Sequence, residues 1–411
     1  MSVSANTSYP KHKIKVLLLE SIHQSANELI LADGLHLETV AGALDEAALI
    51  EKIQDVHLIG IRSKTNVTAD VLRAGKKLLG VGCFCIGTNQ VDLGTANSLG
   101  IPVFNAPFSN TRSVAELIIG QIVALSRKLG DNVRDMHQGI WRKSAKGSFE
   151  VRGKTLGIVG YGRIGRQVGV LAEAMGLRVL FYDTAAQLPM GNNRSVTSLE
   201  EVLRQSDFVS LHVPAAPDTK NMIGAEQIAL MRPGSYLLNL SRGTVVVIEA
   251  LAGALKSGHL AGAAIDVFPS EPRENGPGFV SELVGLKNVI LTPHVGGSTE
   301  EAQEAIGREV GARLLDFLNT GITNGAVNFP QVSPAPLEGS HRILNVHRNV
   351  PGVLSSINSI VSSVKANVTG QVLATDPNIG YLVMDLDRTL SDEVSAKVGA
   401  LDTSIRTRIL Y

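Results

Sequence analysis

Thr155-Leu-Gly-Ile-Val-Gly-Tyr-Gly-Arg-Ile-Gly165 decides the fold of this chain, because it joins an apolar run to a glycine-rich turn. The apolar run predicts a buried strand, and Gln167 to Met175 continue as a helix. Gly160, Gly162 and Gly165 fit the G-x-G-x-x-G spacing: the first permits a tight turn, the second lets a pyrophosphate approach, and the third allows close helix–strand packing. The stretch therefore predicts a dinucleotide-binding βαβ unit.

A second predicted strand, Arg178-Val-Leu-Phe-Tyr182, ends on Asp183. This acidic residue lies about twenty positions beyond the glycines, where a carboxylate accepts hydrogen bonds from the adenosine ribose hydroxyls. A carboxylate there repels a 2′-phosphate, and no arginine follows immediately, so NAD is favoured over NADP. A glycine turn in some other βαβ unit is the competing interpretation, which the strand, the helix and Asp183 together disfavour.

The length, charge and cysteine content of the chain restrict the kinds of protein it can be. Its 411 residues suffice for two or three domains. Lys and Arg together number 38, as do Asp and Glu, so nucleic acid and anionic membranes are poor candidates as partners. We expect a cytoplasmic protein, since no apolar run resembles a signal core or a membrane span. Cys83 and Cys85 are interpreted as buried, inert thiols, and no metal is predicted, because two thiolates make an incomplete zinc site.

Strands and helices alternate in the prediction from Lys11 onward, which is typical of parallel sheets covered by helices. Before the glycine stretch we expect helices at 24–32 and 45–54, one long helix over Arg112 to His137, and strands at 14–19, 37–40, 57–61, 78–82 and 102–104. The region up to residue 104 lacks a phosphate-binding turn, so it is interpreted as a partner domain.

Polar residues follow each later strand, and those strands are expected at 207–212, 235–240, 262–266 and 288–291. Because the carboxyl ends of parallel strands meet at one edge of a sheet, Arg242, Glu271 and His294 are expected to converge beside the dinucleotide.

The tail beyond the proline-containing linker Gly321 to Gly339 has a different order of predicted strands and helices. Its predicted order is strand, helix, strand, strand, helix, strand, at 341–347, 351–364, 368–374, 380–386, 391–400 and 403–411. That order describes a ferredoxin-like βαββαβ domain. The predicted fold class is therefore α/β, with two doubly wound parallel-sheet domains and this small third domain.

Several motifs together resemble those of the D-isomer-specific 2-hydroxyacid dehydrogenases. They are Gly82–Asp92, Asn105–Glu116, Gly160–Gly165, Ser241–Thr244, Ala264–Phe268 and Thr292–Gly297. Within that family the chain is similar, from about Lys13 to Tyr411, to the bacterial type of D-3-phosphoglycerate dehydrogenases with a C-terminal ACT domain. The resemblance implies a substrate domain over 1–108 and 298–337, a Rossmann NAD domain over 109–297, and an ACT domain over 338–411.

The resemblance implies that Arg242 orients the substrate, that His294 is the acid–base residue, and that Glu271 is its acidic partner. Residue chemistry agrees, because the hydroxyl proton must leave with the hydride and histidine titrates near neutral pH. The arginine fork matches the substrate carboxylate. The implied NAD contacts are Gly160, Gly162, Arg163, Ile164, Gly165, Asp183, His212, Pro214, Leu240, Ser241, Asp266, Gly296 and Gly297.

The resemblance also implies the substrate, 3-phosphoglycerate, which the enzyme would oxidise to 3-phosphooxypyruvate in the first step of phosphorylated L-serine synthesis. Arg62 and Lys143 correspond to residues that bind its phosphate, and Ser63 and Asn110 are further expected substrate contacts. Their presence favours a phosphorylated hydroxy acid over lactate or glycerate.

The resemblance of the tail to an ACT domain implies regulation by an amino acid. His347, Asn349 and Asn367 fall where relatives hold L-serine, so feedback inhibition is expected. The hinge Glu338-Gly-Ser340 supplies a single glycine, which departs from the bacterial pattern and bears on how inhibition is transmitted. Because relatives assemble as tetramers, a homotetramer is expected.

Two other functions stay open. A hydroxypyruvate or other 2-keto acid reductase of the same family is disfavoured by the ACT domain and by Arg62 with Lys143. A non-enzymatic, NAD-sensing corepressor is disfavoured because such proteins lack a tail of this kind. NADH formation from 3-phosphoglycerate and NAD would separate the three.

Overall fold

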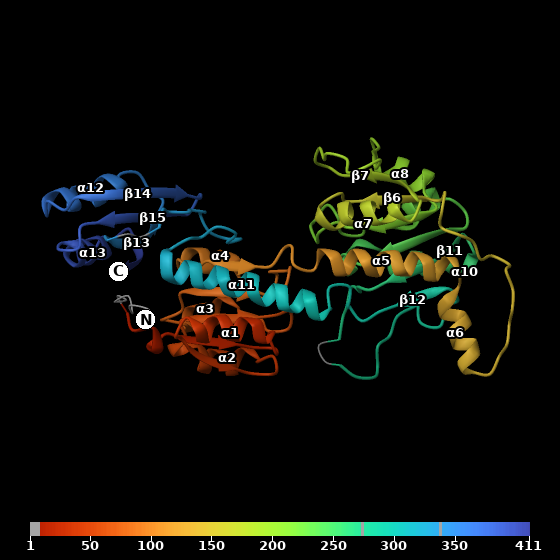
Figure 1. Ribbon diagram of the computed structural model, residues 1–411, viewed down its shortest axis with the longest axis horizontal. Helices are drawn as coiled ribbons and strands as arrows, with labels where there is room; N and C mark the ends of the chain where they lie inside the picture. Colours follow the sequence, from red (N-terminus) through yellow and green to blue (C-terminus); the bar gives the residue numbers. More distant parts are fainter. Residues whose placement is uncertain (1–8, 273–274, 337–338) are drawn as a thin grey trace. The chain divides into compact units, whose positions relative to one another are not determined.

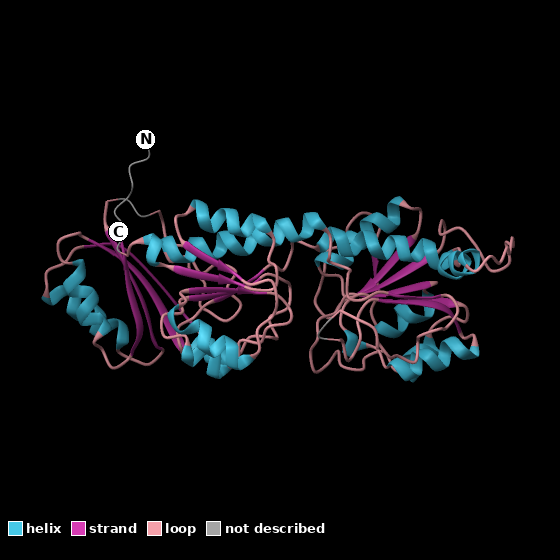
Figure 2. Cartoon of the chain, turned by 90° about the horizontal axis from the view of Figure 1, so that it is seen from below, coloured by secondary structure: helices cyan, strands magenta, loops and turns pink. Residues whose placement is uncertain are grey.

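The computed structural model describes residues 9–272, 275–336 and 339–411, which fall into two compact units (Figure 1). The first unit runs up to Ser109 and resumes at Gln303, and the second unit spans Asn110–Ala302. Figure 2 shows helices on both faces of the parallel sheet in each unit. No helix within the described ranges is both long and apolar enough to cross a membrane.

The first unit contains a five-stranded parallel sheet in the order β2-β1-β3-β4-β5. Its strands are β1 (Lys15–Leu18), β2 (His36–Thr39), β3 (Leu58–Ile61), β4 (Gly80–Cys83) and β5 (Val103–Asn105). Its connecting helices are α1 (Gln24–Ala32), α2 (Glu46–Lys52), α3 (Ala69–Ala74) and α4 (Leu93–Ser98), with short 3₁₀ turns η1 (Lys11–Lys13) and η2 (Ile53–Asp55). Asp45, Thr68 and Asp92 start α2, α3 and α4 by accepting a backbone N–H three residues on, as good N-caps do.

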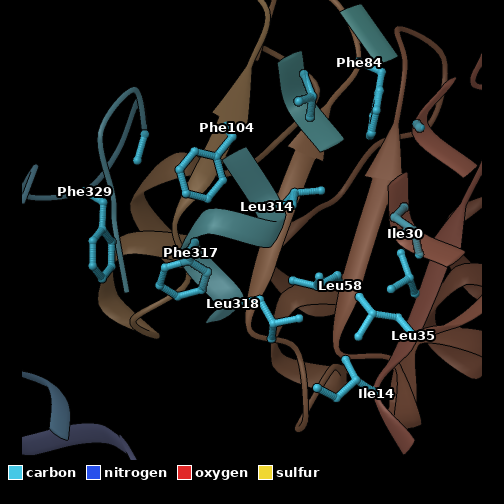
Figure 3. Packing of buried hydrophobic residues seen from close by; sticks show 14 of the residues in the cluster. Ile14, Ile30, Leu35, Leu58, Phe84, Phe104, Leu314, Phe317, Leu318 and Phe329 are labelled. Carbon is cyan, nitrogen blue, oxygen red and sulfur yellow. The ribbon is translucent and has the colours of Figure 1, made fainter. Parts of the chain in front are cut away.

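The core of the first unit includes α11 (Glu300–Thr320), nearly all of which belongs to this unit. Figure 3 shows Leu314, Phe317 and Leu318 of α11 among the buried side chains of the sheet. The rings of Phe104 and Phe317 lie 6.0 Å apart. Burial of such side chains is the main favourable term that holds this late helix on strands from the beginning of the chain.

The tail of the chain also belongs to the first unit, and its antiparallel sheet has the order β14-β15-β13-β16. The strands are β13 (His341–Arg348), β14 (Val368–Thr375), β15 (Ile379–Leu386) and β16 (Ser404–Leu410), and the helices are α12 (Val353–Ser363) and α13 (Ser391–Gly399). One face of this sheet packs on α12 and α13 through Ile343, Leu382 and Met384. The other face contributes Leu344 and Tyr381 to the cluster that contains Phe317.

Arg342 fastens the tail sheet to the rest of the first unit. Its side chain is 0% exposed, and it donates to both carboxylate oxygens of Asp385 at 2.7 and 2.8 Å. The same guanidinium donates to the carbonyls of Thr320 and Ala335 at 2.9 and 2.6 Å. The buried charge is therefore paired and hydrogen-bonded in a bidentate arrangement.

The second unit contains a seven-stranded parallel sheet in the order β12-β11-β10-β9-β6-β7-β8. Its strands are β6 (Thr155–Val159), β7 (Arg178–Tyr182), β8 (Arg194–Ser195), β9 (Phe208–Leu211), β10 (Ser235–Asn239), β11 (Leu260–Ile265) and β12 (Val289–Leu291). Its helices are α5 (Thr111–Ser126), α6 (Leu129–His137), α7 (Arg163–Ala174), α8 (Leu199–Gln205), α9 (Ala225–Leu230) and α10 (Ile248–Ser257), with the 3₁₀ turn η3 (Gly243–Val245). The strand order reverses between β6 and β9, where doubly wound sheets bind dinucleotides.

The prediction of one helix over Arg112 to His137 is wrong. The chain forms α5 and α6 instead, separated by Lys128, whose φ of 52° lies in the left-handed region. The side chain of Asn132 donates to the Arg127 carbonyl at 3.1 Å, which satisfies a backbone group that the break exposes. The predicted fold class, by contrast, is confirmed: two parallel-sheet α/β domains and a βαββαβ tail are present.

Candidate active site

The glycine turn after β6 leaves its backbone open to approach at the start of α7. Gly160 has a φ of 89°, and a Cβ on it would lie 2.7 Å from the His212 carbonyl oxygen. A Cβ on Gly165 would lie 2.3 Å from the Gly160 carbonyl oxygen, so α7 packs closely on the turn. A Cβ on Gly162 would meet no atom within 4 Å, and Gly162 is the residue from which α7 starts. An open approach to a helix N-terminus fits a dinucleotide phosphate.

Asp183 lies beside this turn, at the end of β7. Its carboxylate accepts the Tyr161 N–H at 2.7 Å and the Ala185 N–H at 2.9 Å, one on each oxygen. These bonds fix the half-buried carboxylate. Each oxygen keeps a further acceptor site for a ligand hydroxyl.

His294 and Glu271 form a pair in the second unit. His294 Nδ1 lies 2.8 Å from Glu271 Oε2, and Glu271 Oε1 accepts the Phe268 N–H at 3.0 Å. The backbone of His294 is left-handed, with a φ of 55°, and its N–H donates to the Asp266 carbonyl at 2.8 Å. The carboxylate therefore fixes the orientation of the imidazole and leaves Nε2 as the nitrogen that can exchange a proton.

The two partners shift each other's proton affinity. The hydrogen bond to Glu271 raises the pKa of His294, and the charges of Glu271 and Asp266 add to this, while burial and the charge of Arg242 oppose it. Burial favours a higher pKa for the Glu271 carboxyl, but the hydrogen bonds from His294 and Phe268 and the charges of His294 and Arg242 outweigh it, so the pKa lies below its usual value. An ionised carboxylate thus faces a histidine that holds its proton more tightly than usual.

Arg242 follows β10 and is half-buried, and its Nη1 donates to the Ser241 carbonyl at 2.7 Å. Its charge acts on both His294 and Glu271. A guanidinium near an imidazole–carboxylate pair can bind the carboxylate of a small acid and polarise a neighbouring carbonyl.

Asp266 has a role that sequence reasoning missed. It is 1% exposed, and its carboxylate accepts the Thr292 hydroxyl at 2.5 Å and the N–H groups of Val295 and Gly296 at 2.9 and 2.8 Å. The carboxylate therefore holds the loop that carries His294. The partners of Asp266 lie 26 to 30 positions further along the chain, so no local sequence motif predicts these hydrogen bonds.

The remaining predicted NAD contacts also belong to the second unit, after the carboxyl ends of β6, β9, β10 and β12. His212 Nε2 lies 2.9 Å from the Ser210 hydroxyl, and burial lowers the pKa of His212 to about 3. A neutral imidazole adds no positive charge at the carboxyl end of β9. Pro214 is exposed, Leu240 and Ser241 are buried, and Gly296 and Gly297 follow His294 directly.

Comparison with known proteins identifies the family. A model described as the NAD binding domain of D-isomer specific 2-hydroxyacid dehydrogenases matches residues 119–296, and one for an AHAS small subunit-like ACT domain matches residues 343–406. The chain is 54% identical to the D-3-phosphoglycerate dehydrogenase of Dictyostelium discoideum, over 98% of this chain and 99% of that protein. The chain belongs to the D-isomer-specific 2-hydroxyacid dehydrogenases. It is also 52% identical to the D-3-phosphoglycerate dehydrogenase of Escherichia coli strain K12, over 99% of this chain and 100% of that protein.

Two solved structures have a similar fold. The TT0316 protein of Thermus thermophilus is similar with a TM-score of 0.68 and 31% identity, over 74% of this chain and 97% of that one. The D-lactate dehydrogenase of Aquifex aeolicus, complexed with NAD and lactic acid, gives a TM-score of 0.66 and 28% identity, over 78% of this chain and 100% of that one. The predicted family resemblance, the NAD cofactor and the class of NAD-dependent oxidoreductase are confirmed.

The predicted substrate contacts are divided between the units of this dehydrogenase. The half-buried Arg62 and the exposed Ser63 follow β3 in the first unit, whereas Asn110 and the exposed Lys143 belong to the second. Within the described ranges, Asn110 Oδ1 is buried without a hydrogen-bond partner. A buried acceptor of this kind is costly unless a ligand or water satisfies it.

The predicted effector residues lie in the tail of the dehydrogenase. His347 on β13 is buried, with Nδ1 3.0 Å from Asn345 Oδ1, and burial lowers its pKa. Asn349 is exposed and donates to the Asp376 carbonyl at 2.7 Å, and the exposed Asn367 precedes β14. Glu338, the first residue of the predicted hinge, lies outside the described residues.

Proposed function

We propose that this protein catalyses the NAD-dependent oxidation of 3-phospho-D-glycerate to 3-phosphooxypyruvate, the first step of phosphorylated L-serine synthesis. The 54% identity over nearly the full length to a protein named D-3-phosphoglycerate dehydrogenase carries the proposal. The pair of His294 and Glu271 beside Arg242 supports it, because this set of groups suits oxidation of a 2-hydroxy acid. NADH formation from 3-phosphoglycerate, measured against hydroxypyruvate reduction, tests it.

Bound NAD supplies the hydride acceptor, and the side chains manage the proton and the carboxylate. Glu271 accepts the Nδ1–H of His294, so Nε2 accepts the C2 hydroxyl proton while the hydride leaves C2 and the carbonyl forms. Arg242 holds the substrate carboxylate and, in the reverse direction, polarises the carbonyl. The proton on His294 then passes to water.

The proposal assigns three domains. Residues 1–108 and 298–337 bind the substrate, 109–297 bind NAD, and 338–411 bind the effector. In this assignment Arg62 and Lys143 bind the substrate phosphate, and Ser63 and Asn110 contact the rest of the substrate. We further propose a cytoplasmic homotetramer. Size measurement in solution tests the tetramer.

Arg62→Ala is expected to raise KM for 3-phosphoglycerate roughly ten- to hundredfold, because a charge-assisted contact to the phosphate is lost. Turnover of unphosphorylated D-glycerate should hardly change. Steady-state kinetics with both substrates measure the difference. Arg73→Ala is the matched control, since Arg73 is an exposed arginine paired with Asp70 on α3. Equal losses on both substrates would count against a phosphate contact.

L-Serine is expected to inhibit the enzyme, and Asn349→Ala to raise the half-inhibitory concentration by about tenfold, the loss of one or two hydrogen bonds. The family model for an ACT domain over residues 343–406 supports an amino-acid effector. Serine titrated against NADH formation measures the effect, with Ser362→Ala on the exposed side of α12 as control. An enzyme insensitive to serine and to similar amino acids would leave the tail without this role.

A further inference from the structure

The turn between β1 and α1 places a carboxylate inside the first unit. Glu20 and Ser21 both have left-handed backbones, with φ values of 61° and 49°. The Glu20 N–H donates to the Gly42 carbonyl at 3.1 Å, and the Ser21 hydroxyl donates to the Ala41 carbonyl at 3.0 Å. Non-glycine residues adopt this backbone region uncommonly, so two in succession need support from their surroundings. The turn directs Glu20 inward, where it is only 8% exposed.

The carboxylate of Glu20 binds the backbone of the loop that follows β3. Its Oε1 accepts the N–H groups of Arg62 and Thr65 at 3.2 and 2.9 Å, and its Oε2 accepts the N–H of Lys64 at 3.0 Å. A buried charge is costly unless hydrogen bonds replace its hydration, and three backbone donors do so here. The charge is used to hold a loop that has no regular secondary structure of its own.

The carbonyl side of Arg62 is held as well. Gln90 Nε2 donates to the Arg62 carbonyl at 2.6 Å, and the Cys85 thiol lies 3.7 Å from the same oxygen. The N–H and the C=O of Arg62 are thus both fixed, while its side chain is half-buried and makes no ion pair with the described residues. The backbone is anchored and the guanidinium remains available.

We propose that Glu20 is a positioning residue for substrate binding: it holds the loop 62–65 so that Arg62 and Ser63 meet the phosphorylated substrate without reordering. This inference rests on the proposed function, in which Arg62 binds the phosphate. A carboxylate suits the task because it only accepts hydrogen bonds, so each oxygen can face N–H groups. A glutamine at this position would direct its NH₂ group, which is a donor, toward one of these backbone N–H groups.

Glu20→Gln tests the proposal with little change in side-chain volume. We expect faster amide hydrogen exchange at residues 62–65, a KM for 3-phosphoglycerate raised roughly tenfold, and a kcat within about threefold of the parent, since one or two hydrogen bonds to the loop are lost. Glu28→Gln, on the exposed face of α1, is the matched control and should change none of these. Glu20→Asp keeps the charge but shortens its reach, and it replaces Glu20→Gln if that variant fails to fold.

The double variant with Arg62→Ala separates positioning from a general loss of stability. If Glu20 acts by positioning Arg62 and Ser63, adding Glu20→Gln to Arg62→Ala raises KM by clearly less than the roughly tenfold expected of Glu20→Gln alone. Unchanged exchange at 62–65 would overturn the proposal, as would a normal KM in a Glu20 variant while Arg62→Ala raises it. A normal KM in both single variants would instead overturn the assigned role of Arg62, and with it the proposed phosphate site.

Discussion

Replacing His294 with asparagine is expected to lower kcat for 3-phosphoglycerate oxidation by about a thousandfold, which is within the range for losing a general base. Asparagine suits the site because the left-handed backbone at this position, with a φ of 55°, tolerates it better than most residues. An amide can still hydrogen-bond to Glu271, but it cannot accept the substrate proton. Single-turnover NADH formation measures the change, and unaltered NAD affinity and melting temperature show that the fold is intact.

The pH profile provides the control for this result. Oxidation requires the neutral form of His294, so kcat/KM rises with pH through a pKa that the Glu271 hydrogen bond raises. Glu271→Gln should move this rise to lower pH and reduce the limiting rate, because the imidazolium that forms is no longer stabilised. In His294→Asn the rise should disappear. A variant that keeps the rise of the parent enzyme would show that another group takes the proton.

Gly162→Val is expected to raise the dissociation constant for NAD by about a hundredfold, about 2.7 kcal/mol, with little change in melting temperature. A Cβ at this position meets no atom within 4 Å, so a side chain can start here without displacing neighbouring protein atoms. It would occupy the space through which a pyrophosphate approaches the first turn of α7. Fluorescence titration with NADH and a thermal melt measure the two quantities.

Gly165→Ala is the contrasting variant for this experiment. Its Cβ would lie 2.3 Å from the Gly160 carbonyl oxygen, so α7 must move away from the turn, and the melting temperature should fall. The two glycines should therefore separate a loss of affinity from a loss of stability. Normal NAD affinity in Gly162→Val would contradict the placement of the pyrophosphate at this turn.

Short-range patterns made the architecture predictable, because strand alternation, glycine spacing and polar strand ends are local properties of the chain. The order of the tail, β13 to β16 with its two helices, followed from periodicity alone. The break at Lys128 did not, since the apolar periodicity of α5 continues toward α6 while the backbone turns left-handed.

The groups that hold the site were harder to foresee than the groups that face it. Asp266 was expected to contact NAD, but its hydrogen bonds to the loop around His294 were not foreseen. Glu20 belongs to no recognised sequence motif, and the backbone N–H groups that it binds lie 42 to 45 positions further along the chain. Such contacts depend on the register of β1 against β3, which becomes visible only in three dimensions.

The bridge between Arg342 and Asp385 bears on how regulation should be dissected in the laboratory. Truncation before the tail would expose Phe317 and the apolar side chains around it. It would also remove the Arg342 guanidinium that donates to the Thr320 and Ala335 carbonyls. The truncated enzyme would then expose apolar surface and aggregate. Its activity would therefore not show whether removal of the tail relieves inhibition. Single substitutions on the exposed surface of the tail leave these contacts intact, so they are the better way to study regulation.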